Sequence, residues 1–203
     1  MYASRMTATP AKAADEGNSY SYRPSLLGAA FEFKLSGDGI DFAVGNRSGH
    51  VPFRNIRRIR MSYKPVSMQS QRYLTEIWAE GAPKLNIVSS SWKSMLEQER
   101  RDRPYSAFIA ELHRRIAATG APVRLEQGTN PIIYWPGLTV FTGVALALVV
   151  LIVRALPSDA PLGAAFITAF LILFFWHGGK FFRRNRPGLY RADAPPPGLL
   201  PKG

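Results

Sequence analysis

The chain has 203 residues and a formal net charge of +12, from 26 Lys and Arg against 14 Asp and Glu. It contains no cysteine, which excludes disulfides, thiolate metal sites and a cysteine nucleophile. A chain this basic is suited to nucleic acid or to an anionic membrane surface. Because the sequence has neither a basic helix nor an aromatic RNA-binding motif, we expect no nucleic-acid binding.

Residues 1–24 are rich in Ala, Ser and Thr. They lack the apolar stretch of about 7–15 residues that a secretory signal requires. We therefore expect a disordered lead, whose aromatic end at Tyr20–Tyr22 could dock on the domain that follows.

From Leu26 on, apolar and polar residues alternate, as is typical of half-buried strands. The expected strands cover residues 30–35, 40–44, 50–53, 56–63, 72–78 and 84–88. Glycine-rich turns separate the first three, and Pro52 indicates an edge strand or the end of a strand. Short strands at a spacing of about 8–12 residues predict a sandwich or a small barrel.

One amphipathic helix is predicted over residues 102–119, with Asp102 as its N-cap and Gly120 at its end. Its apolar positions recur at helical spacing and should pack on the sheet. They are Tyr105, Phe108, Ile109, Leu112 and Ile116. We expect His113 at the surface or boundary of this helix, and residues 89–101 as a loop or a short extra helix.

The order of these elements resembles a bacterial pleckstrin-homology-like (PH-like) domain. The resemblance covers about Leu26–Gly120, within a domain expected at 25–122, and includes the segment Val51–Ile59 between hairpins. It implies an α+β fold, with a bent seven-stranded barrel closed by the C-terminal helix. One strand is then still to be assigned, at 20–22 or within 89–92. Phosphoinositide-binding members carry several Lys and Arg in the first hairpin, whereas the turn at 36–39 is acidic here, so the resemblance does not extend to that site.

After a linker at 123–133, an apolar region at 134–182 predicts a transmembrane hairpin of two helices, 134–153 and 162–180. The first run has twenty residues without Asp, Glu, Lys, Arg or His. At about 1.5 Å per residue, such a helix covers the roughly 30 Å of a bilayer core. The alternative, two buried helices of a soluble protein, is disfavoured because helices of that kind have a polar face and these have none.

Basic residues flank the hairpin, while its central turn is neutral. Those that follow the second helix are Lys180, Arg183, Arg184 and Arg186. Positively charged flanks stay on the cytoplasmic side. We therefore expect a multi-pass protein of the bacterial inner membrane with both termini in the cytoplasm. Its cytoplasmic tail at 183–203 is basic and proline-rich, and the segment 194–200 should be extended or disordered. Basic residues at the bilayer surface also attract anionic lipid headgroups.

Two further sets of residues in the hairpin have expected roles. Aromatic side chains suited to the membrane interface are Tyr134, Trp135 and Trp176. Small residues at helix-packing spacing are Gly143, Ala147, Ala165 and Ala169. The small residues are explained by packing of the two helices against each other, or by self-association or docking to another membrane subunit.

The densest basic cluster of the soluble region lies around the strand at 56–63. It consists of Arg54, Arg57, Arg58, Arg60 and Lys64. Guanidinium groups bind phosphate and carboxylate in a bidentate manner, so the cluster could face anionic headgroups or an acidic partner. The alternative is a solvated strand face that discourages edge pairing.

No motif for nucleophilic catalysis, nucleotide binding or metal ligation is present, and the three histidines lack ligand spacing. We expect no enzyme activity and no cofactor. The sequence favours a membrane-anchored cytoplasmic PH-like module that binds a protein partner or the anionic membrane surface. The alternative is an accessory or assembly subunit of a membrane complex, which docks through its transmembrane hairpin.

Overall fold

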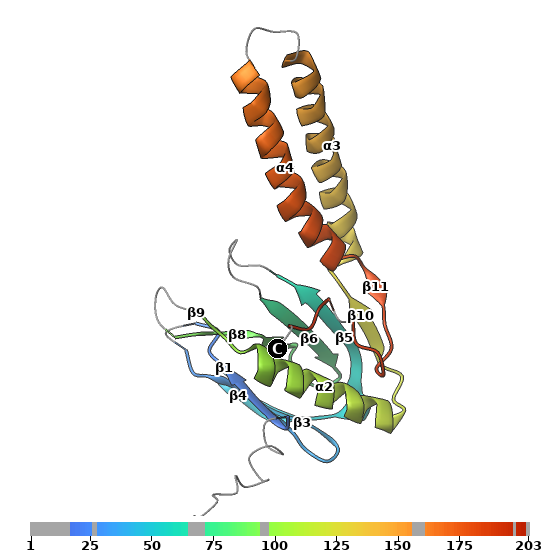
Figure 1. Ribbon diagram of the computed structural model, residues 1–203. Helices are drawn as coiled ribbons and strands as arrows, with labels where there is room; N and C mark the ends of the chain where they lie inside the picture. Colours follow the sequence, from blue (N-terminus) through green and yellow to red (C-terminus); the bar gives the residue numbers. More distant parts are fainter. Residues whose placement is uncertain are drawn as a thin grey trace, which may run out of the picture. The chain divides into compact units, whose positions relative to one another are not determined.

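A computed structural model divides the chain into two compact units (Figure 1). It describes residues 17–25, 28–64, 72–93, 98–155, 161–196 and 198–201. We call the described part of 17–126 and 189–201 the head, and the described part of 127–188 the hairpin. Most of the expected lead, the loop at 65–71 and the turn at 156–160 lie outside the described residues.

The first sheet of the head is antiparallel, in the order β1-β2-β3-β4. Its strands are β1 (Ser19–Tyr22), β2 (Phe31–Leu35), β3 (Gly39–Val44) and β4 (Arg47–Pro52). The predicted alternation is confirmed, since Phe33, Leu35 and Ile40 are buried while Glu32 and Lys34 are exposed. β4 is an edge strand that ends at Pro52, as the proline predicted.

The second sheet has the order β11-β10-β5-β6-β7. Its strands are β5 (Ile56–Tyr63), β6 (Tyr73–Ala79), β7 (Leu85–Val88), β10 (Arg124–Gln127) and β11 (Gly188–Leu189). A 3-10 turn, η1 (Phe53–Asn55), precedes β5. The central strands match their predicted ranges closely. Ile59, Met61 and Tyr63 of β5 are buried, as the alternation predicted, whereas β6 is buried on both faces over 73–77.

Residues expected as a loop or helix form a two-stranded ribbon, β8 (Ser90–Trp92) with β9 (Gln98–Arg100). β1 also forms at the end of the expected disordered lead, so both places considered for the missing strand contain one. Their polar and aromatic composition concealed this, because it lacks the alternation of apolar and polar residues that predicts a strand. In β1, Tyr20 pairs with Phe33 of β2.

Helix α2 (Asp102–Thr119) buries the predicted apolar stripe. The hydroxyls of Tyr105 and Thr75 on β6 are 2.7 Å apart, and Gly120 ends the helix in a left-handed conformation at φ 62°. Two expectations were wrong. Arg101, not Asp102, occupies the N-cap position, and His113 is 1% exposed rather than on the surface.

Two tyrosines of β1 join the sheets. The hydroxyl of Tyr20 donates to the carbonyl of Val88, and that of Tyr22 to the carbonyl of Asn86, each at 2.5 Å. They satisfy acceptors of β7, the last strand of the second sheet. The described strands form sheets that do not close into a barrel. The α+β class is confirmed, whereas the PH-like barrel is not.

The tail, whose segment 194–200 was predicted to be extended or disordered, packs on the head in the described residues from 189 onward. The Tyr190 amide donates to the carbonyl of Leu125 at 3.1 Å, so the returning chain lies beside β10. Leu199 is 2% exposed, and the hydroxyl of Ser106 on α2 donates to the carbonyl of Pro201 at 3.3 Å. The described end of the tail is therefore held on the head by a buried leucine and by one hydrogen bond from α2.

The hairpin consists of α3 (Pro131–Ala155) and α4 (Pro161–Arg184). Both helices are long and apolar enough to cross a membrane. α3 begins before the predicted boundary, where the side chain of Asn130 accepts from the amide of Ile132 at 3.1 Å, and Pro136 lies within it. The expected linker at 123–133 therefore holds β10 and the first turn of α3.

The contacts between α3 and α4 are aromatic. The rings of Phe141 and Phe174 stack at 4.5 Å, and Gly178 leaves the space that the Phe141 ring occupies. The small residues predicted to pack the helices are exposed instead. These are Gly143, Ala147, Ala165 and Ala169. The spacing of these four residues is typical of helix packing. In the structure, however, α3 and α4 meet through faces that carry Phe141 and Phe174.

Within the hairpin, the start of α3 lies beside the end of α4. The amide of Thr129 donates to the carbonyl of Asn185 at 3.0 Å, and the hydroxyl of Tyr134 donates to the carbonyl of Phe182 at 3.2 Å. Tyr134 is thus a buried packing residue of the hairpin. Trp135 and Trp176 are more than half exposed, and their role at a membrane interface stays a prediction.

Candidate functional site

The predicted basic cluster around β5 is largely neutralised within the head. Arg57 lies at the irregularity in the pairing of β5 with β6 and binds the carboxylate of Glu80 at 2.8 Å. This hydrogen bond raises the pKa of Arg57 and lowers the pKa of Glu80. The guanidinium group of Arg57 is therefore already occupied.

Arg60 is held more tightly. Its Nε lies 2.9 Å from Oε2 of Glu126 on the neighbouring strand β10, and both side chains are mostly buried, at 14% and 11% exposed. The second oxygen of Glu126 contacts Arg124 at 2.7 Å. Arg60 thus belongs to a closed network of charges on the sheet and is unsuited to an external anion.

Arg58 lies on Trp78, its cross-strand neighbour on β6, with the guanidinium carbon 3.8 Å from the ring centroid. Lys84 approaches the same ring at 4.8 Å. Of the five predicted residues, only Arg54 and Lys64 are exposed without an ion pair or a cation–π contact among the described residues. The cluster that is dense in sequence is therefore mostly part of the sheet's own packing.

A second basic site lies at the other end of the β5–β6 hairpin, and we call it the basic groove. It has a volume of about 370 Å³ and is lined by segments from β1 to β8. Its charged residues are Arg23, Lys64, Arg72, Lys84 and Glu76. Only Lys64 belonged to the predicted cluster.

Strand register brings two of these cations together. Tyr63 and Tyr73 are the last paired residues of β5 and β6, so Lys64 and Arg72 follow as the next opposed positions. The amide of Lys64 donates to the carbonyl of Arg72 at 2.8 Å. Like charges at such positions repel each other unless an anion lies between them.

The charges of the groove are only partly compensated. Lys84 binds Glu76, whose side chain is 11% exposed. Arg23, Lys64 and Arg72 have no carboxylate partner in the part of the chain that the structure describes. Moreover, Nε of Arg72 is buried without a hydrogen-bond acceptor among the described residues, an arrangement that costs stability unless a ligand supplies one.

Aromatic side chains form one wall of the groove. Tyr22 packs edge to face on Phe31 at 5.6 Å between ring centroids, and Trp92 donates its backbone amide to the carbonyl of Arg23 at 3.1 Å. Burial raises the pKa of the Tyr22 hydroxyl, while the nearby charge of Arg72 opposes that shift. Tyr22 therefore contributes an uncharged side chain to the groove, next to the positive charge of Arg72.

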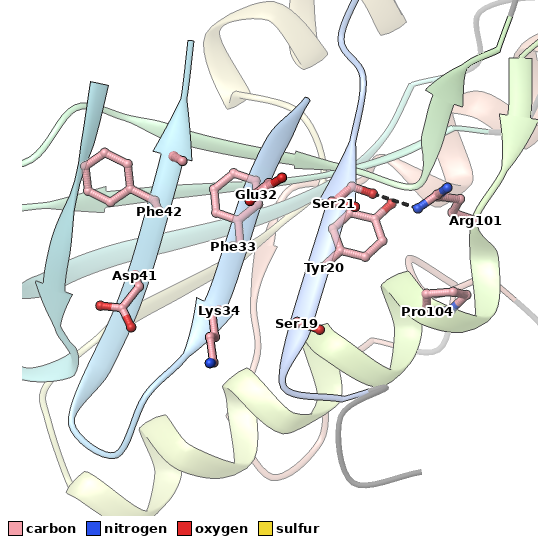
Figure 2. Close-up of a pocket in the computed structure, with 11 residues that line it drawn as sticks. Ser19, Tyr20, Ser21, Glu32, Phe33, Lys34, Asp41, Phe42, Arg101 and Pro104 are labelled. Atoms are coloured by element: carbon pink, nitrogen blue, oxygen red, sulfur yellow. Dashed lines mark hydrogen bonds between the residues drawn. The ribbon is translucent and has the colours of Figure 1, made fainter. Parts of the chain in front are cut away.

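A larger depression, of about 670 Å³, lies over the first sheet. In Figure 2 the rings of Tyr20, Phe33 and Phe42 lie in a row across β1, β2 and β3, and the guanidinium of Arg101 donates to the carbonyl of Ser21 at 3.1 Å. Two acidic and two basic residues line this depression, so their formal charges sum to zero. They are Glu32, Lys34, Asp41 and Arg101. This depression lacks the charge excess of the basic groove.

Two histidines have opposite environments. His50 lies between two carboxylates, with Nδ1 2.7 Å from Asp41 and Nε2 3.4 Å from Asp38, and the hydrogen bond to Asp41 is the main cause of its raised pKa. His113 is buried, which lowers its pKa, and Tyr190 donates a hydrogen bond to its Nε2 at 2.7 Å while its Nδ1 donates to the carbonyl of Ile109. Among the described residues, no group of three acidic or histidine side chains could hold a metal ion.

Sequence reasoning missed Arg23, Arg72 and Lys84 because they lie on separate segments. One signal was available, since Lys64 and Arg72 flank the same loop and must face each other if the hairpin pairs as predicted. In comparisons with known proteins, the chain matches no protein-family model, no curated protein and no solved structure. The PH-like resemblance therefore has no support from a relative.

Proposed function

We propose that this chain is a membrane-anchored binding module of the bacterial inner membrane. The observation that carries the proposal is that the two ends of the apolar hairpin segment lie together. The chain leaves the head after Leu125 and returns at Tyr190, which hydrogen-bonds back to Leu125. Within the hairpin, Thr129 and Asn185 are hydrogen-bonded in the same way.

Because both ends of the hairpin lie together, its two helices would cross the bilayer and return to the starting side. The basic residues of the flanks, including Lys180 and Arg183, favour the cytoplasm for that side. Both termini and the head would then be cytoplasmic. In this proposal the head acts as a PH-like module that holds a protein partner or the anionic surface, and it acts by binding rather than by catalysis.

Fractionation and topology mapping test this proposal. We expect the full chain to stay in the membrane fraction after a high-salt and alkaline wash and to require detergent for extraction. Single cysteines at Ser48 in the head and Ser158 in the central turn should differ in labelling by an impermeant maleimide, with only Ser158→Cys modified from outside. Release without detergent, or labelling of Ser48→Cys from outside, would refute the proposal.

An accessory subunit that docks through its hairpin is the second candidate. It is favoured by the exposure of the four small residues, because α3 and α4 pack through other side chains. Small residues allow another helix to approach closely. The double variant Gly143→Leu/Ala147→Leu should then abolish crosslinking to a membrane partner. Val149→Leu, also exposed on α3 but on another face, six residues after Gly143, should leave it unchanged. Unaltered crosslinking of the double variant would refute docking through this face.

A further inference from the structure

We propose that the basic groove binds a phosphate group of an anionic ligand, with Arg72 as the central donor and Lys64 and Arg23 beside it. This deepens the proposed function, on which it rests, by naming the ligand chemistry that the head would hold at the membrane. The groove shares only Lys64 with the predicted cluster. Three arginines of that cluster, Arg57, Arg60 and Arg58, are already engaged by Glu80, Glu126 and Trp78, respectively.

The charge of the groove requires a counter-ion. Four cations and one carboxylate line it, and the carboxylate, Glu76, is engaged by Lys84. Three cations are left, two of them opposed across a strand pair. An anion bound among them would relieve the repulsion and accept from the buried Nε of Arg72.

Phosphate suits this site for geometric reasons. A guanidinium group donates two parallel hydrogen bonds to neighbouring oxygens, and an ammonium group can contact a third. At about 370 Å³ the groove admits a headgroup-sized anion but is small for a folded partner or a nucleic-acid strand. The aromatic wall of Tyr22, Phe31 and Trp92 offers apolar contact to whatever carries the phosphate.

A lipid headgroup and a free phosphate share this chemistry, so the experiment has an arm for each. The full chain is purified in a neutral detergent at low salt, where binding can be measured whether or not its membrane topology is as proposed. Calorimetric titration uses inorganic phosphate, short-chain phosphatidic acid and, as the zwitterionic control, short-chain phosphatidylcholine. Increasing salt should weaken binding, because the contacts are ionic.

The variants are Arg72→Gln and Lys64→Gln, with Arg54→Gln as the matched control. Arg54 is an exposed arginine outside the groove. Loss of one charge-assisted hydrogen bond should weaken binding by about tenfold or more in each groove variant, whereas the control should change affinity by less than about twofold. Lys64 is exposed, so its variant should fold even if Arg72→Gln does not.

Tighter binding of phosphatidic acid than of inorganic phosphate supports the proposal and identifies a lipid headgroup, while equal binding supports it and identifies a free phosphate. Absence of binding to both anions at low salt would overturn it, as would equal affinities of the wild type and both groove variants. Binding of an acidic peptide that phosphate does not displace would also overturn it. A chain that binds phosphate in detergent but is not an integral membrane protein would refute only the proposed function.

Discussion

The head contains two groups of basic side chains that differ in how their charges are satisfied. Arg57, Arg58 and Arg60 lie within four residues of sequence, and each has a partner within the head. The cations of the basic groove come from four segments, and Arg23, Lys64 and Arg72 have no carboxylate partner among the described residues. The group that is conspicuous in sequence is structural, whereas the dispersed group has charge left for a ligand.

This difference shows that many basic residues close together along a strand do not by themselves provide side chains that are free to bind a ligand. On the outer face of the second sheet, Glu126, Arg60, Glu76 and Lys84 form two ion pairs across neighbouring strands. Each arginine of β5 is thereby placed next to an acid or an aromatic ring. At the end of the same hairpin no acid lies opposite Lys64, so the groove keeps its positive charge.

Among variants that test the difference between the two groups, Arg60→Met should have the largest effect on the free energy of unfolding. The substitution leaves Glu126 mostly buried with only Arg124 as a partner. Breaking such a pair should lower the free energy of unfolding by about 2–4 kcal/mol. Thermal unfolding of the detergent-purified chain measures the loss. Arg57→Met, which removes an exposed pair, should change it far less, and equal effects of the two would contradict the assignment of Arg60 to a buried network.

A smaller effect is expected from Lys84→Met, because Lys84 lines the groove but already has a carboxylate partner. Its side chain is 41% exposed, and its ammonium binds the carboxylate of Glu76, whose side chain is 11% exposed. Removing the partner of a buried carboxylate should cost about 1–2 kcal/mol of unfolding free energy. The double variant Lys84→Met/Glu76→Gln should recover part of this loss, which the same melting experiment would show. No recovery would mean that the pair does not couple.

The cation–π contacts can be tested with Trp78→Leu, which retains an apolar side chain under Arg58 and Lys84. Loss of the ring should reduce the unfolding free energy by about 1 kcal/mol. The double variant Trp78→Leu/Arg58→Met separates packing from electrostatics. If the ring and the guanidinium group interact, the double variant should lose less unfolding free energy than the sum of the two single variants. Strict additivity would indicate that Arg58 gains nothing from the ring.

The smallest effect on stability is expected for the groove variants. Lys64→Gln relieves repulsion without breaking an ion pair among the described residues, so the unfolding free energy should change by less than about 0.5 kcal/mol in low salt. Added phosphate should raise the melting temperature of the wild type more than that of the variant. A large loss of stability without ligand would instead make Lys64 a structural residue like Arg60.

Much of the local structure could be predicted from the sequence. The strands at 56–63 and 73–79 and the helix at 102–119 follow from the spacing of apolar side chains, and the long apolar runs indicated two helices that could span a membrane. These are properties of consecutive residues, so the local sequence pattern is enough to predict them.

Tertiary structure decided which distant residues meet. It placed Tyr22 against β7, brought Tyr190 back beside Leu125, buried His113 on α2 and turned Gly143 away from α4. It also paired Arg60 with Glu126 and left Arg72 without an acid among the described residues. The sequence could not show these contacts, because the partner of a charge or a ring is set by strand order and register between segments far apart in the chain.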